Sequence, residues 1–256
     1  MKKILFLLYG VVCYLIFFGT FLYALGIVGN LYVPNSIDGV PEVPLWQAIL
    51  TNSAFLVLFA VQHSVMARPA FKRRFTKFVS EPVERSTYVL FSSLVLIGLM
   101  VFWQPMGGVV WSAESPLCIA LLNILFFAGW GLVLLSTFMI NHFDLFGLRQ
   151  VWMYFQGKPY TPLHFRIPFL YKWVRHPLYL GWLIAFWATP TMTVTHLLFA
   201  LATTGYILVA IRFEESDLVA HFGQKYREYR QRVPMLLPFS LKKPNDAAGY
   251  QVSKQE

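Results

Sequence analysis

Residues 176–211 read HPLYLGWLIAFWATPTMTVTHLLFALATTGYILVAI, without a single Asp, Glu, Lys or Arg. About 20 apolar residues cross a bilayer core as a helix, so this run is too long for one crossing. Residues 189–193, TPTMT, interrupt it. Proline removes a backbone donor there, and threonine hydroxyls can satisfy the carbonyls that are freed. The stretch therefore predicts a hairpin of two helices that returns the chain to the membrane face it left.

Four further apolar runs precede this hairpin, at 4–29, 45–67, 86–104 and 117–140. Each is close to the length of a spanning helix. The composition, 57% hydrophobic and 13% charged, makes lipid the solvent for most of the chain. The first run exceeds the apolar stretch of a signal peptide, so we expect a retained anchor. The predicted fold class is an all-α polytopic membrane bundle of four spanning helices plus a C-terminal helical hairpin, with a cytoplasmic cofactor-binding cap.

The 21 Lys and Arg residues fall before residue 4 and in 68–85, 141–176 and 212–256, whereas loops 30–44 and 105–116 have none. Because Lys and Arg accumulate in cytoplasmic loops, we predict a multi-pass protein of the bacterial inner (cytoplasmic) membrane with its N-terminus and active site cytoplasmic. Topology and anionic lipid headgroups account for the net charge of +9, so we expect membrane lipid as a partner, no nucleic acid and no obligatory protein partner.

The chain reads as one integral membrane domain, 1–256, without internal repeats. Residues 1–140 form the predicted bundle, 141–240 the cofactor and catalytic region, and 241–256 a disordered tail. Within the second part, 214–233 has apolar residues at spacings of three and four and ends before Pro234, which predicts an amphipathic helix.

Two motifs flank the hairpin: VRHPLYLG at 174–181, and RFEESDL at 212–218 followed by FGQKYREY at 222–229. Since the hairpin returns, we expect them to meet at one interface. As a set they resemble the isoprenylcysteine carboxyl methyltransferase and phospholipid N-methyltransferase superfamily of membrane enzymes. The resemblance implies S-adenosyl-L-methionine as cofactor, held by the matching positions Arg175, His176, Tyr179, Gly181, Glu214 and Glu215.

The chemistry of these residue types agrees with that implication. The cofactor has an α-carboxylate, a ribose diol and a sulfonium, which call for a cation, a carboxylate and aromatic faces. Glycine would let a helix or the cofactor approach closely. No metal site is expected.

Three more segments, QHSVMARP at 62–69, ERSTY at 84–88 and NHFDLFGLRQ at 141–150, resemble the bacterial methanethiol S-methyltransferase family. That resemblance implies S-adenosylmethionine-dependent methylation of a small thiol, methanethiol, to dimethyl sulfide. Two alternatives remain: methylation of a lipid-like or prenylcysteine substrate, and a haem-linked membrane protein of nitrogen-oxide metabolism with histidines as axial ligands.

A thiol must become a thiolate before it attacks the methyl group, so a base is expected near the cytoplasmic helix ends. The candidate catalytic residues are His142 with Asp144, and then His63. His142 and Asp144 are two positions apart and share no helical face, so a contact between them requires the chain to leave the helix there.

The charge pattern makes a topological prediction. A reporter fused at Gly39 should be periplasmic and one fused at Phe75 cytoplasmic, because all Lys and Arg lie on one side. Labelling of introduced cysteines by an impermeant reagent in intact cells measures this. Labelling at Phe75 but not at Gly39 would invert the topology.

Overall fold

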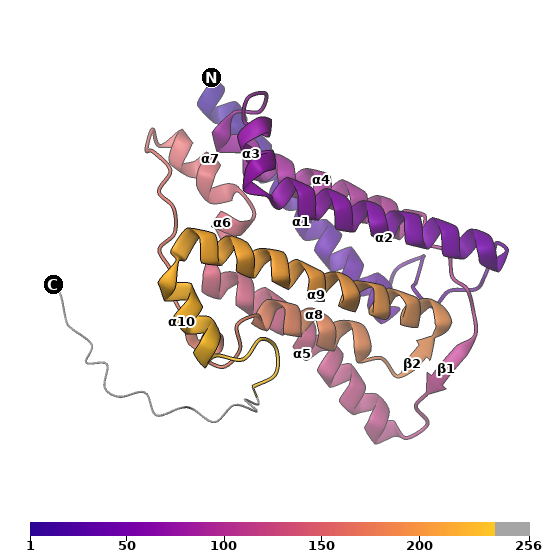
Figure 1. Cartoon of the computed structure of the whole chain (residues 1–256). Helices are drawn as coiled ribbons and strands as arrows, with labels where there is room; N and C mark the ends of the chain where they lie inside the picture. Colours follow the sequence, from indigo (N-terminus) through magenta and orange to yellow (C-terminus); the bar gives the residue numbers. More distant parts are fainter. Residues whose placement is uncertain (239–256) are drawn as a thin grey trace.

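The computed structural model describes residues 1–238, so the tail predicted at 241–256 lies outside the described residues (Figure 1). Within 1–238, five helices are long and apolar enough to span a membrane: α1 (Lys2–Gly29), α2 (Leu45–Ala67), α4 (Glu81–Val101), α5 (Pro116–Ile140) and α9 (Val194–Phe222). The shorter elements are α3 (Pro69–Phe75), β1 (Val109–Ser112), α6 (His142–Leu145), α7 (Leu148–Phe155), η1 (Phe169–Lys172), α8 (Pro177–Trp187), β2 (Thr191–Thr193) and α10 (Gln224–Arg232). The predicted all-α membrane fold is confirmed.

Prolines mark where several helices begin. Pro82, Pro116 and Pro177 stand in the first turns of α4, α5 and α8, where the missing N–H costs no intrahelical bond. α4 spans 81–101 instead of the predicted 86–104. The charged residues at its start kept residues 81–85 out of the predicted apolar run. Pro82 and an acidic first turn nevertheless suit a helix N-terminus. Near its end, the residue before Pro105 disfavours the helical conformation.

The predicted hairpin is present, and its turn is more ordered than the sequence indicated. α8 has 11 residues, a rise of about 16 Å, so it covers only about half of a bilayer core. The extended chain that follows completes the crossing and forms β2, which pairs antiparallel with β1. The Thr193 side chain then caps α9 by accepting a hydrogen bond from the backbone N–H of His196 at 3.1 Å.

The amphipathic helix predicted at 214–233 is wrong in its boundaries. α9 continues through Phe222, and the chain breaks at Gly223, whose φ of 60° lies in the left-handed region. Only glycine adopts that region without strain, so α10 leaves α9 at a new angle. The two carboxylates Glu214 and Glu215 thus lie inside the long membrane helix and not at the start of a surface helix.

The long helices pack in two groups: α1 and α2 both pack on α4, and α5 and α9 both pack on α8 (Figure 1). Aromatic rings join the groups, since Phe21 of α1 lies 5.1 Å from Trp130 of α5 and 6.0 Å from Trp182 of α8, centroid to centroid. α2 also contacts α9.

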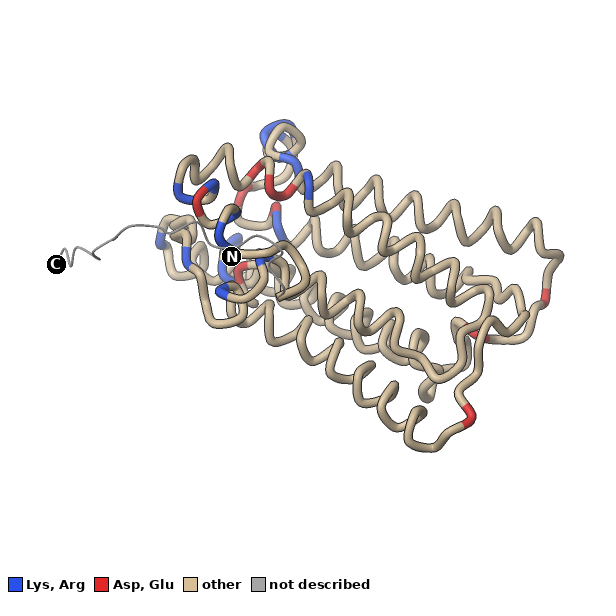
Figure 2. The backbone as a smooth tube through the Cα atoms, turned by 60° about the horizontal axis from the view of Figure 1, so that its bottom comes forward, with Lys and Arg blue, Asp and Glu red and all other residues tan. Residues whose placement is uncertain are grey.

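Charge is strictly one-sided along the bundle. In Figure 2 the Lys and Arg of the described chain gather at one end, which we call the basic end, and the opposite end carries only acidic residues. These are Asp38, Glu42 and Glu114. Both ends of the hairpin lie at the basic end, as predicted from the sequence.

At the opposite end, Asp38 fastens the loop after α1 to the hairpin. It accepts hydrogen bonds from Nδ2 of Asn30 at 2.7 Å, from the Thr193 hydroxyl and from Nδ1 of His196 at 3.3 Å. Burial would raise the pKa of Asp38, but these hydrogen bonds outweigh it and hold the pKa below its usual value. The carboxylate is therefore charged and structural.

The α5–α8 packing makes a stability prediction. A Cβ on Gly129 would lie 2.6 Å from the backbone nitrogen of Ala185, whereas one on Gly131 would meet nothing within 4 Å. Gly129→Ala should therefore destabilise the protein, and Gly131→Ala should be neutral or stabilising because alanine favours the helix by up to ~1 kcal/mol. Thermal unfolding of the two purified variants in detergent measures this, and equal midpoints would contradict the close helix contact.

Candidate functional site

The Arg-His pair at the start of α8 meets the carboxylates of α9. Nε of Arg175 donates to Oε1 of Glu215 at 2.7 Å, and Nε2 of His176 lies 3.1 Å from the same oxygen. The Arg175 and Glu215 side chains are each only 11% exposed. Because a carboxylate oxygen only accepts, the proton of His176 is on Nε2. The hairpin thus brings the two motifs together.

The chain after α10 folds back onto this pair. The backbone N–H of Arg175 donates to the carbonyl of Pro234 at 2.9 Å, and that of His176 to the carbonyl of Met235 at 3.1 Å. Nη1 of Arg175 donates to the carbonyl of Val233. These bonds use Nε and Nη1, and within residues 1–238 Nη2 makes none, so part of the guanidinium remains for a ligand.

The two adjacent glutamates have different surroundings. Glu215 is buried against Arg175 and His176 and also faces Arg230 at 3.8 Å. Glu214 is 43% exposed, its Oε2 lies 4.0 Å from Nδ1 of His176, and Tyr179 lies beside it. Glu215 is therefore occupied by the protein itself, whereas Glu214 is the carboxylate open to a ligand.

Two tyrosines of α10 lie against this cluster. Tyr229 donates its hydroxyl to the carbonyl of Tyr171 at 2.7 Å, and burial raises the pKa of Tyr229 to about 12. Burial, with Glu215 and Glu214 nearby, also raises the pKa of Tyr226. Both tyrosines are thus neutral at physiological pH, and their rings pack on Phe165 and on each other.

Gly181 serves helix packing. A Cβ there would lie 2.8 Å from the backbone oxygen of Gly129 and 2.8 Å from the backbone nitrogen of Val133, both on α5. The sequence left open whether a helix or the cofactor approaches Gly181 closely. In the structure it is helix α5 that does so.

His142 is enclosed by its neighbours. Nε2 lies 2.8 Å from the Tyr14 hydroxyl, Nδ1 lies 2.8 Å from the Thr137 hydroxyl, and the ring stacks on Phe138 at 4.3 Å. The residue is 2% exposed, and burial lowers its pKa. Both ring nitrogens therefore have partners, and no edge of the ring is open.

Asp144 does not contact the His142 ring, although the chain leaves the helix at Asn141. It accepts from Nη1 of Arg149 at 2.8 Å and from the Tyr160 hydroxyl at 3.3 Å. Arg149 also donates to Thr161 at 2.9 Å. Asp144 thus fastens the segment that follows α7, and its proposed help to His142 has no geometric support.

His63 has a different environment, at the junction of α2, α4 and α9. The Tyr88 hydroxyl lies 3.0 Å from each ring nitrogen, and Ser92 lies 3.3 Å from Nδ1. The ring stacks on Phe59, with 5.1 Å between centroids, and Tyr206 lies at 6.5 Å. We call His63, Tyr88, Tyr206 and Phe59 the His63 cluster.

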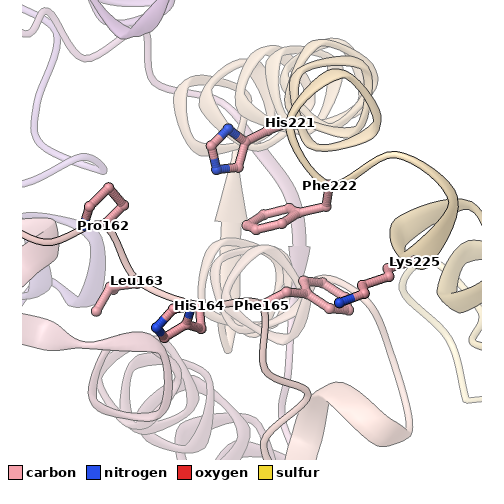
Figure 3. A pocket seen from close by; sticks show the side chains of 7 residues that line it. All are labelled: Pro162, Leu163, His164, Phe165, His221, Phe222 and Lys225. Atoms are coloured by element: carbon pink, nitrogen blue, oxygen red, sulfur yellow. The ribbon is translucent and has the colours of Figure 1, made fainter.

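Two open cavities lie on the basic end beside α10. The first, of about 400 Å³, is bordered by the segment after α7 and by the end of α9 (Figure 3). Its lining residues are Pro162, Leu163, His164, Phe165, His221, Phe222 and Lys225. The second, of about 380 Å³, shares Phe165 and Lys225. Phe165 packs on Tyr226 at 6.1 Å, so an aromatic wall links the cavities to the motif residues.

Sequence reasoning missed several residues of this region. Tyr88 was noticed only as part of a resembling segment, and Tyr206 and Tyr14 not at all. A tyrosine in an apolar helix resembles an interfacial anchor, and only the packing of separate helices shows which histidine it faces.

Together these observations define a class: a polytopic helical membrane protein with an Arg-His-Glu-Glu site at one membrane face. Comparison with known proteins then narrows it. The chain is 54% identical over 239 residues to the methanethiol S-methyltransferase of Crocosphaera subtropica, covering 93% of each chain. It is 53% identical to that of Mycobacterium tuberculosis, covering 93% of this chain and 98% of the relative. The chain belongs to the methanethiol S-methyltransferase family.

A more distant relative is Nurim of Xenopus laevis, 31% identical over 207 residues that cover 72% of this chain and 70% of Nurim. No protein-family model matches the sequence, and no solved structure matches it.

The Glu215 contacts make a second stability prediction. Glu215→Ala leaves Arg175 and His176 unpaired in a largely buried position, and losing one partner of a buried pair costs about 3–5 kcal/mol. Glu228→Ala, at an exposed position of α10, is the control. Thermal unfolding in detergent should separate the two variants clearly, and a Glu215→Ala protein as stable as the control would refute the structural role.

Proposed function

We propose that this protein transfers a methyl group from S-adenosylmethionine to methanethiol and forms dimethyl sulfide. The observation that carries the proposal is the meeting of Arg175, His176 and Glu214 at the mouth of the hairpin, in a chain of the methanethiol S-methyltransferase family.

The residues present fit this methyl donor. Glu214 is open to accept hydrogen bonds from a ribose diol or an amino group, and the remaining donors of Arg175 suit a carboxylate. Tyr179, which is only partly buried, offers an aromatic face to a cation. Glu215 supports the site by holding Arg175 and His176 in place.

When bound, S-adenosylmethionine supplies an electrophilic methyl group on a positively charged sulfur. The residues of the chain have to hold that methyl in line with the incoming sulfur and exclude water. The aromatic side chains between α8, α9 and α10 suit the second task. We assign the basic end to the cytoplasmic side of the bacterial inner membrane, where Lys and Arg are retained.

The alternatives are less well supported. A haem held by two axial histidines needs a free nitrogen on each imidazole, and both nitrogens of His142 have hydroxyl partners. A prenylcysteine or a phospholipid remains a chemical alternative to methanethiol. Purified protein incubated with S-adenosylmethionine and a panel of thiols, prenylcysteines and phospholipids decides between them, and dimethyl sulfide from methanethiol is the expected product.

The donor site makes a binding prediction. Glu214→Ala and His176→Ala should each abolish S-adenosylmethionine binding, since one removes the open carboxylate and the other its buried neighbour. Membrane insertion should be unchanged. Calorimetry on the purified variants measures affinity, with thermal unfolding as the check on folding, and near-wild-type affinity in both would exclude this site.

A further inference from the structure

We infer that His63, positioned by Tyr88 and packed against Phe59 and Tyr206, takes the proton from a small thiol. The inference rests on the proposed function and adds the substrate side of the same site. Four observations support it: the position of the cluster, the ring nitrogen of His63 that can accept a proton, the neighbouring charges, and the nearness of the donor residues.

The cluster lies deeper in the membrane than the motif residues. His63 is four positions, or about 6 Å, before the end of α2 at Ala67. Tyr206 precedes Glu214 by eight positions of α9, which is about 12 Å. Polar and ionisable side chains are costly at this depth, and they persist there mainly where they have a function.

His63 keeps a nitrogen available, in contrast to His142. A tyrosine hydroxyl can bond only one ring nitrogen at a time, and the Tyr88 hydroxyl is 3.0 Å from both nitrogens of His63. With Tyr88 or Ser92 on Nδ1, Nε2 can accept a proton. Geometry therefore favours His63 over His142 as the base.

Tyr179 connects the cluster to the donor site. It lies beside Glu214, and it is also close enough to Tyr206 and Tyr88 for electrostatic interaction. One tyrosine of the motif is therefore near both the open carboxylate and the His63 cluster. A thiol at His63 would approach the donor along Tyr179, from the membrane side.

Nearby cations favour an anionic substrate. Arg68 and Arg85 both act electrostatically on His63, and Arg85 also lies over the Tyr88 ring at 5.7 Å. Arg68 is paired with Asp217 of α9 at 2.9 Å. Tyr88 and Tyr206 are further titratable groups beside His63. Two positive charges favour a thiolate over a thiol beside them, and they also oppose a lasting positive charge on His63, so its proton has to pass on to water.

The aromatic neighbours indicate a small substrate. Phe59 lies 5.1 Å from the His63 ring and 6.0 Å from the Tyr206 ring, centroid to centroid. Rings at such spacing pack directly on one another, so the cluster leaves no room for a prenyl chain between them. A small uncharged thiol also reaches this depth through lipid, which fits the placement.

The step balances as follows. Nε2 of His63 takes the proton from the thiol, and the electron pair left on sulfur forms the new bond to the methyl carbon. The bond between that carbon and the donor's sulfonium breaks, and its electron pair neutralises the sulfonium. His63 then releases its proton to water, which restores the base.

The test is the pH dependence of turnover in the full-length protein, at saturating S-adenosylmethionine, with dimethyl sulfide as the readout. His63→Gln should lower turnover about 10²–10⁴-fold near pH 7, and the loss should shrink as pH rises because hydroxide then ionises the thiol. Tyr88→Phe should lose up to about tenfold, the worth of one hydrogen bond, with the same trend. Calorimetry should show unchanged donor affinity in both variants.

Three results would overturn the inference: a His63→Gln loss that stays constant across pH, which marks a structural role; no loss at all; or a pH-dependent loss in His142→Gln instead. If the wild-type protein forms no dimethyl sulfide, the proposed function itself fails. If it does and His63→Gln follows the wild-type profile, only the assignment of His63 fails.

Discussion

The hairpin closes through one carboxylate, and the functional end of the molecule depends on it. Oε1 of Glu215 receives both Arg175 and His176, at 2.7 and 3.1 Å. Two buried cationic or polar groups would be costly without it. The same contact fixes the start of α8 against the end of α9, which lets the chain after α10 bond to the backbone of Arg175. Glu214 is left open because its neighbour carries the structural role.

Much of the fold follows from physical rules that act on sequence alone. Hydropathy located α2 at 45–67, as observed, because lipid requires continuous apolar helix. Charge placement located both ends of the hairpin. The β1–β2 pair could not be predicted, since strand pairing joins residues such as Val109 and Thr193 that are remote in sequence. The break at Gly223 was missed because a glycine is tolerated within a helical pattern, and only its φ shows the bend.

The candidate site was predictable where the residues form a motif and hidden where packing decides. Spacing and the hairpin placed Arg175 beside the glutamates, but which glutamate faces the arginine depends on helix rotation. The sequence ranked His142 first as the base because polar residues crowd it. In the structure those neighbours bond elsewhere, while Tyr88 and Tyr206, from two distant helices, converge on His63. With His63 as the proposed base, the proposed functional region includes residues of the first half of the chain as well as 141–240.

The most direct test of this account is a structure of the full-length protein with S-adenosylhomocysteine, the demethylated product of the donor. The account predicts its sulfur beside Tyr179, directed toward Tyr88 and His63, with Glu214 on the ribose or the amino group. A sulfur directed toward His142, or toward the cavity between His164 and His221 and away from the membrane, would contradict it.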